Sequence, residues 1–147
     1  IKKSDHLNNK IIAALQKNAR VSFAEIRRIV GITPPAVAER VKKLEDTAVI
    51  LKYHTEVSYT QMGYQLKAMI TLRAFVGKLK PFLEVVKTYP EVVNCYRITG
   101  NENIMMEVVL QDQQHLEKFI DILIQYGETR THIILSEVVS SAPIYAN

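Results

Sequence analysis

The feature that most constrains the fold of this chain is a glycine placed between two short amphipathic segments. Residues 30–45 read VGITPPAVAERVKKLE. Gly31 can adopt a positive φ at no steric cost, Thr33 can cap a following helix, and Pro34 suits the first helical position. The apolar positions of that helix, spaced at i, i+4 and i+7, are Val37, Val41 and Leu44. The pattern predicts a helix, a tight turn and a second helix that packs against a core along one stripe.

The opposite face of the predicted second helix is small and basic. Pro35 and Ala36 allow close approach to base edges, whereas Arg40 and Lys43 can pair with phosphates. These properties favour a helix that enters a DNA groove. The predicted DNA-binding residues are Thr33, Pro34, Pro35, Ala36, Glu39, Arg40, Lys43, Arg27 and Arg28.

Two alternatives stay open on this helix. By periodicity alone it could be a surface helix of a small bundle, but a capped helix that precedes it at the right spacing favours the DNA-binding interpretation. Glu39 could accept a hydrogen bond from a cytosine amino group or pair with Lys43 at i+4, and we favour the intrahelical pair. Arg27 and Arg28, with Lys42 and Lys52, are expected to contact phosphate or solvent rather than read bases.

The neighbouring segments complete a winged helix-turn-helix. Asp5 can cap a first helix that ends near Asn18, and its apolar stripe is Leu7, Ile11, Ile12 and Leu15. Ser22 and Glu25 fit a capping box at the start of the second helix. The buried side of that helix is predicted to be Phe23, Ile26, Ile29 and Val30. Residues 49–57 are rich in β-formers, which suits a wing or a strand that leads out of the domain.

Charge divides the chain into unlike halves. Residues 1–60 hold 11 Lys or Arg against 6 Asp or Glu, and residues 61–147 hold 8 against 9. A basic module that meets a polyanion, joined to a second module, explains this asymmetry. No apolar run is long enough for a membrane span and no signal peptide is evident, so we expect a cytoplasmic protein.

The second half predicts the element order βαββαβ. Strands are expected at 66–76, 92–99, 104–111 and 129–138. One helix follows the first strand, with Pro81 in its first turn, and the other precedes the last strand, with Gly127 closing it. This order is that of a ferredoxin-like sheet with both helices on one face. The predicted fold class is α+β, with a DNA-binding domain at 1–50, a linker strand or hinge at 51–63 and a ligand-binding domain at 64–147.

The other face of the predicted sheet is too apolar for a free surface. Alternation assigns to it Met69, Phe75, Met105 and Val109. A second copy of the same sheet would cover this face, and a two-fold dimer also suits a helix-turn-helix that reads paired half-sites. The alternative is an antiparallel sheet that tolerates a few exposed apolar residues.

The sequence shows no catalytic or metal-binding constellation. It lacks a nucleophile elbow, a phosphate-binding glycine loop and an H-E-x-x-H pair, and its lone Cys95 is expected to be a small core residue. The four scattered histidines are His6, His54, His115 and His132. We therefore predict no catalytic residues, no metal and no cofactor.

Taken together, these residues resemble the Lrp/AsnC family of transcriptional regulators over almost the whole chain. Motifs along the chain carry the resemblance. They are Asp5 with Ile11-Ile12 and Leu15, residues 18–20, Glu39-Arg40-Val41, Leu44-Glu45, Val49-Ile50, Tyr53, Gly63-Tyr64, residues 90–96, 98–100 and 116–119, and Thr129-x-Thr131. The resemblance implies a winged helix-turn-helix, a linking strand and a βαββαβ domain that dimerises through its sheet and often assembles into octamers. It also implies a small amino acid bound between dimers.

The resemblance places the amino acid between a loop and the last strand. The implied effector-binding residues are Ile98, Thr99, Gly100, Asn101, Glu102, Asn103, Gly127, Thr129 and Thr131. Loop amides and hydroxyls can hold a carboxylate, and acidic or amide side chains can hold an ammonium group. Asn103 stands where many members of the family have aspartate, so the ammonium contact could pass to Glu102. Ala48 stands where glycine is common after the recognition helix, so the helix is expected to end differently.

The leading hypothesis is a sequence-specific regulator that binds double-stranded promoter DNA and whose assembly responds to a small amino acid. Two alternatives belong to other classes. One is an architectural DNA-binding protein without an effector, and the other is an enzyme akin to the sirohaem decarboxylases that resemble this family. The scattered histidines and the intact recognition helix argue against the enzyme.

Overall fold

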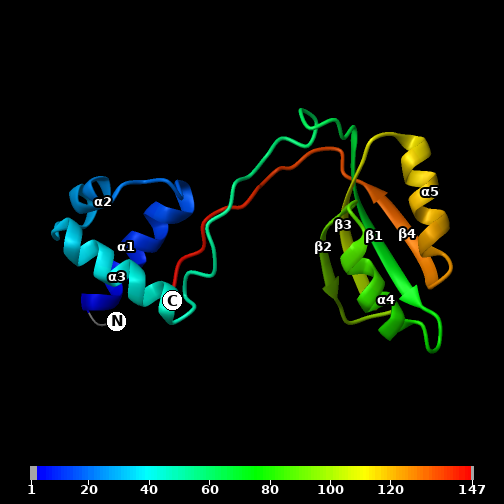
Figure 1. Cartoon of the computed structure of the whole chain (residues 1–147), viewed down its shortest axis with the longest axis horizontal. Helices are drawn as coiled ribbons and strands as arrows, with labels where there is room; N and C mark the ends of the chain where they lie inside the picture. The colour runs from blue at the N-terminus through cyan, green and yellow to red at the C-terminus, as the bar shows by residue number, and fades with distance from the viewer. Residues whose placement is uncertain (1–2, 147) are drawn as a thin grey trace. The chain divides into compact units, whose positions relative to one another are not determined.

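The chain forms two compact units. A computed structural model describes the backbone of residues 3–146 and the side chains of residues 6–146. Of the described residues, one unit comprises 3–56 together with 139–146, and the other comprises 57–138 (Figure 1). The sequence assigned residues 64–147 to the second domain, but the segment 139–146 packs with the first unit.

The first unit holds three helices, as predicted: α1 (Lys3–Lys17), α2 (Phe23–Val30) and α3 (Pro34–Asp46). Its core takes side chains from all three, namely Ile11, Ile26, Val37, Val41 and Leu44. Because α1 begins at Lys3, Asp5 lies inside the helix and not at the predicted cap. The side chain of Asp5 lies outside the described residues.

Helix α2 buries less apolar surface than predicted. Ile26 is fully buried, but Phe23 is 39% exposed and Ile29 is 53% exposed. The two exposed residues lie three positions either side of Ile26, about 60° from it around the helix axis. A short helix on a five-residue core therefore buries only a narrow stripe.

The end of α3 also differs from the prediction. Ala48 adopts the left-handed conformation with φ 58°, and the amides of Val49 and Ile50 donate to the Leu44 carbonyl oxygen at 2.9 and 3.0 Å. The helix thus keeps a left-handed cap without glycine. Neither the wing nor the outgoing strand predicted for residues 49–57 forms, since these residues adopt no helix or strand in this single chain. Residues of high β propensity become a strand only where a neighbouring strand supplies backbone partners.

The second unit has the predicted βαββαβ order. Its elements are β1 (Leu66–Ala74), α4 (Leu79–Val85), the 3-10 helix η1 (Val86–Thr88), β2 (Val92–Arg97), β3 (Ile104–Leu110), α5 (Gln113–Leu123) and β4 (Gly127–Ile133). The strands form one antiparallel sheet in the order β2-β3-β1-β4, which is the ferredoxin-like arrangement. Both helices pack on the same face, where Phe82 and Phe119 join sheet residues such as Ile70, Leu72 and Met106 in the core (Figure 1).

Two details of β4 correct the sequence-based boundaries. The strand ends at Ile133 and not near Val138. Gly127 does not close α5, which ends at Leu123, but begins β4 opposite Ala74. It is buried there, and a Cβ on this residue would overlap the backbone carbonyl of Arg73. A close approach of two strands, and not a helix cap, requires this glycine.

Candidate DNA interface and ligand site

The turn between α2 and α3 has the predicted geometry. Ser22 Oγ accepts from the Glu25 amide at 3.1 Å, while the Glu25 carboxylate accepts from the Ser22 amide at 3.3 Å. Gly31 is left-handed with φ 77°. Thr33 Oγ1 then accepts from the Ala36 amide at 3.4 Å, with proline at the start of α3. Side-chain caps therefore define the starts of α2 and α3, and the left-handed Gly31 ends α2 at the turn.

The outward face of α3 is narrower than predicted. Pro35, Glu39, Lys42 and Lys43 are exposed, while Pro34 and Ala36 are half-buried. Glu39 and Lys43 do not form an ion pair, although both side chains are described. The favoured intrahelical pair is thus absent, and the Glu39 carboxylate remains available to a base edge.

Arg40 does not belong to this outward face. Its side chain is half-buried, and Nη1 donates a hydrogen bond to Asn8 Oδ1 of α1 at 3.1 Å. By contrast, Arg27 and Arg28 in the last turn of α2 are exposed. The exposed cations described in α2 and α3 are therefore Arg27, Arg28, Lys42 and Lys43.

In the second unit, Asn103 fastens the loop between β2 and β3 to the end of β1. Its amide donates to the Leu72 carbonyl at 3.1 Å, its carbonyl accepts from Ile98 at 3.1 Å, and its side-chain Oδ1 accepts from the Ala74 amide at 3.0 Å. The Asn103 carboxamide oxygen therefore already accepts a hydrogen bond within the protein. Gly100 supplies the positive φ that the loop needs, at 109°.

The loop reaches β4 through an ion pair. Glu102 Oε1 lies 3.5 Å from Arg130 Nε, with the carboxylate side chain 25% exposed and the guanidinium side chain 75% exposed. Arg130 is a site residue that the sequence analysis missed. The sequence could have indicated it, because Arg130 stands between Thr129 and Thr131 and therefore projects from the opposite face of the strand.

The two predicted threonines lie apart from this ion pair. Thr129 pairs with Leu72 and Thr131 with Ile70, whereas Arg130 pairs with Thr71. Directly opposed residues of an antiparallel pair project to the same face. Both threonines therefore face the helix-covered side of the sheet, where they are half-buried, and Arg130 faces the open side.

The open face of the sheet is more covered at one corner than predicted. Val109 is only 4% exposed, and Lys67 on the neighbouring strand is ion-paired with Glu137 and lies 4.9 Å from the Tyr59 ring centroid. The hydrogen bond to Glu137 raises the pKa of Lys67. Phe75 lies beyond the end of β1 and is 47% exposed.

The centre of the open face holds an unsatisfied hydroxyl. Thr71 is 8% exposed, and its Oγ1 is buried without a hydrogen-bond partner among the described residues. The half-buried Met105 lies directly opposite Thr71 on β3, and the half-buried Met69 lies two residues before Thr71 on β1. A buried hydroxyl without a partner costs free energy, so this centre is suited to contact with another surface.

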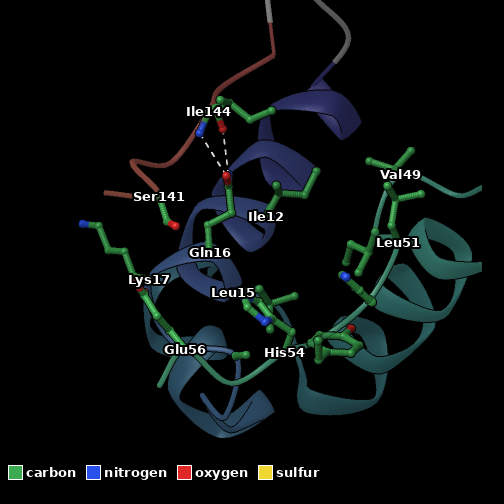
Figure 2. A pocket seen from close by; sticks show the side chains of 14 residues that line it. Ile12, Leu15, Gln16, Lys17, Val49, Leu51, His54, Glu56, Ser141 and Ile144 are labelled. Atoms are coloured by element: carbon green, nitrogen blue, oxygen red, sulfur yellow. Dashed lines mark hydrogen bonds between the residues drawn. The ribbon is translucent and has the colours of Figure 1, made fainter. Parts of the chain in front are cut away.

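The first unit contains a cavity of about 550 Å³ between α1, residues 49–56 and the segment 139–146 (Figure 2). Ile12, Leu15 and Val49 are among its apolar walls. At one side Gln16 grips the backbone of Ile144, donating to its carbonyl at 2.7 Å and accepting from its amide at 2.9 Å. This carboxamide clamp holds the segment 139–146 against α1 (Figure 2).

Groups of three or more His, Cys, Asp or Glu side chains that could hold a metal do not occur among the described residues. Burial raises the pKa of the Cys95 thiol, which opposes formation of a nucleophilic thiolate. His115 accepts from the Gln111 amide at 3.0 Å and lies 3.2 Å from Glu91, so it joins β3, α5 and the start of β2. None of the helices described in residues 3–146 is long and apolar enough to cross a membrane.

A capped helix-turn-helix in one unit and an open-faced ferredoxin-like sheet in the other define a DNA-binding protein with a separate ligand or assembly domain. Comparison with known proteins gives the family. Residues 5–45 match the AsnC-type helix-turn-helix domain, and residues 67–144 match the Lrp/AsnC ligand binding domain. The chain belongs to the Lrp/AsnC family and is a DNA-binding transcriptional regulator.

Individual relatives agree along nearly the full length. The chain is 31% identical over 136 residues to the HTH-type transcriptional regulator LrpC of Bacillus subtilis, covering 92% of this chain and 94% of LrpC. The structure of B. subtilis LrpC superposes with a TM-score of 0.88 at 30% identity, covering 95% of this chain and 99% of that one. A regulator from Neisseria meningitidis, solved with L-methionine, has a TM-score of 0.89 at 23% identity, covering 98% and 96% of the two chains.

Proposed function

We propose that this regulator binds promoter DNA as a homodimer, and that a small amino acid bound by the second unit controls its further assembly, up to an octamer. The amino acid is its only small-molecule requirement in this proposal, and no catalytic step is involved. The observation that carries the proposal is the ion pair between Glu102 and Arg130.

The ion pair presents both charges that an amino acid zwitterion requires. An α-ammonium group can replace Arg130 at the Glu102 carboxylate, and an α-carboxylate can replace Glu102 at the guanidinium group. Because Asn103 Oδ1 is committed to the Ala74 amide, Glu102 is the better acceptor for the ammonium group. Support also comes from two proteins with this fold that were solved with L-methionine, from N. meningitidis and Mycobacterium tuberculosis.

The dimer in this proposal forms through the open face of the sheet. Met69, Thr71 and Met105 supply an apolar centre with an unsatisfied hydroxyl, which a second copy would cover and satisfy. A ligand that fits one assembly better than another shifts the population toward that assembly. A change in assembly then changes how many α3 helices engage DNA together.

A thermal-shift panel of the twenty amino acids tests the effector. A ligand at 100 times its Kd should add roughly 2.7 kcal/mol of stability. We expect at least one amino acid to raise the unfolding temperature of the wild-type protein, and Glu102→Gln and Arg130→Gln to abolish that rise. Glu128→Gln, on the same strand, is the matched control and should keep it. No shift with any amino acid would refute effector binding.

A further inference from the structure

The hydrogen bond between Arg40 and Asn8 changes the role of the most central cation of α3. The two residues are 32 positions apart, yet Nη1 lies 3.1 Å from Oδ1 in a partly buried setting. Arg40 precedes the buried Val41 and lies between the exposed Glu39 and the core stripe. Its guanidinium group therefore reaches toward α1 and away from the exposed row.

This bond adds a directional contact to a helix that also packs through its apolar stripe. The core stripe of Val37, Val41 and Leu44 consists of apolar contacts, which are non-directional. A guanidinium group donates in a fixed planar fork, and a hydrogen bond from a charged donor is stronger than one between neutral groups. A small rotation of α3 about its own axis would turn Glu39 and Lys43 together, and so change the direction in which they face DNA.

We propose that Arg40 is a positioning residue of the DNA-binding helix and not a DNA contact. Through Asn8 it ties α3 to α1 and sets the direction in which Glu39, Lys42 and Lys43 face. The phosphate contacts then come from exposed cations such as Lys43. Asn8, which the sequence does not mark as part of the DNA interface, becomes a determinant of DNA binding.

A double-mutant cycle on DNA affinity tests this assignment. The probe is a duplex selected by the full-length wild-type protein from a random pool, and a shuffled duplex measures specificity. Asn8→Ala and Arg40→Ala should each weaken binding to the selected duplex by about tenfold, as expected for loss of a hydrogen bond to a charged group. The loss in the double variant should be smaller than the sum of the two single losses, because the contact between Arg40 and Asn8 is lost in each single variant.

The salt dependence separates positioning from contact. Lys43→Ala should lower the slope of log affinity against log salt by about 1, while Asn8→Ala and Arg40→Ala should leave that slope unchanged and lower the preference for the selected duplex. Asn8→Asp should bind at least as tightly as the wild type, since a carboxylate accepts from the same guanidinium group. Folding of each variant is checked by circular dichroism at the assay temperature, and Asn8→Ser with Arg40→Lys replaces the alanine pair if either alanine variant is unfolded.

The opposite pattern would overturn the proposal. If Arg40→Ala lowers the salt slope as Lys43→Ala does, while Asn8→Ala binds like the wild type, Arg40 is a phosphate contact. Additive losses in the double variant would lead to the same conclusion. Arg40→Lys distinguishes the roles again, because lysine keeps the charge for a phosphate but lacks the planar fork for Asn8.

Discussion

At the residue scale, Ala48 carries backbone strain at the end of the DNA-binding helix. Its φ of 58° lies in the left-handed region, which costs a residue with a Cβ atom about 1 kcal/mol or more. We predict that Ala48→Gly raises the free energy of unfolding of the first unit by about 1 kcal/mol, measured by urea denaturation. Ala38→Gly, inside α3, is the matched control and should lower it by about 1 kcal/mol. Equal effects of the two substitutions would show that Ala48 is unstrained.

The candidate ligand site shows why residue identity alone does not define a site. The resemblance identified the loop and the strand correctly as neighbours, since Glu102 meets Arg130. It did not separate Thr129 and Thr131 from the open face, because the facing of each side chain depends on strand register. Arg40 was likewise assigned from its charge and helical position, but its contact with Asn8 is a tertiary one.

At the element scale, two patterns set by neighbours in sequence were confirmed, whereas two features that depend on a distant segment were predicted wrongly. The capping box at Ser22 and the alternation that predicted β1 are local. Residues 51–57 have the composition of a strand but no pairing neighbour in one chain. Gly127 was interpreted as a helix cap because the approach of Arg73, far away in sequence, is invisible in a single sequence.

The packing of the segment 139–146 on α1 depends on two backbone hydrogen bonds to one side chain. Ile144→Pro removes the amide that donates to Gln16 at 2.9 Å. We predict that this change raises amide exchange of residues 139–146 by about fivefold or more, as expected for loss of a bond worth about 1 kcal/mol. Hydrogen exchange with mass spectrometry measures the effect.

Ile144→Val is the control for that experiment. It keeps both backbone groups and alters only a side chain that is 79% exposed. Exchange equal to that of the wild type is expected for Ile144→Val. If Ile144→Pro also exchanges like the wild type, the clamp at Gln16 does not hold the segment.

At the scale of the whole molecule, the open face of the sheet is the proposed dimer interface, so a charge placed there should disrupt the dimer. Met105→Glu places a carboxylate beside the buried Thr71, so burial of this face against a second copy would carry a large desolvation cost. We predict that Met105→Glu shifts the protein from dimers or larger assemblies to monomers at about 10 μM, because an unpaired buried charge costs several kcal/mol. Sedimentation velocity measures the shift.

Lys87→Glu provides the control for assembly. Its side chain is 70% exposed on η1 and, among the described ion pairs, pairs only with Glu84, whose side chain is 78% exposed. An ion pair of this kind contributes little, so the variant should assemble as the wild type does. A dimeric Met105→Glu variant would place the interface elsewhere.

In this account the first unit binds DNA and the second unit binds an amino acid and controls assembly, and one experiment tests the coupling between them directly. Fluorescence anisotropy with a duplex selected by the protein measures DNA affinity without and with each of the twenty amino acids, and sedimentation velocity follows assembly in the same samples. The account predicts that at least one amino acid changes the apparent Kd by about fivefold or more, the lower end of typical coupling energies, together with the assembly size. It also predicts that Arg130→Gln loses both responses while keeping DNA binding. Tight DNA binding that no amino acid alters would contradict the account.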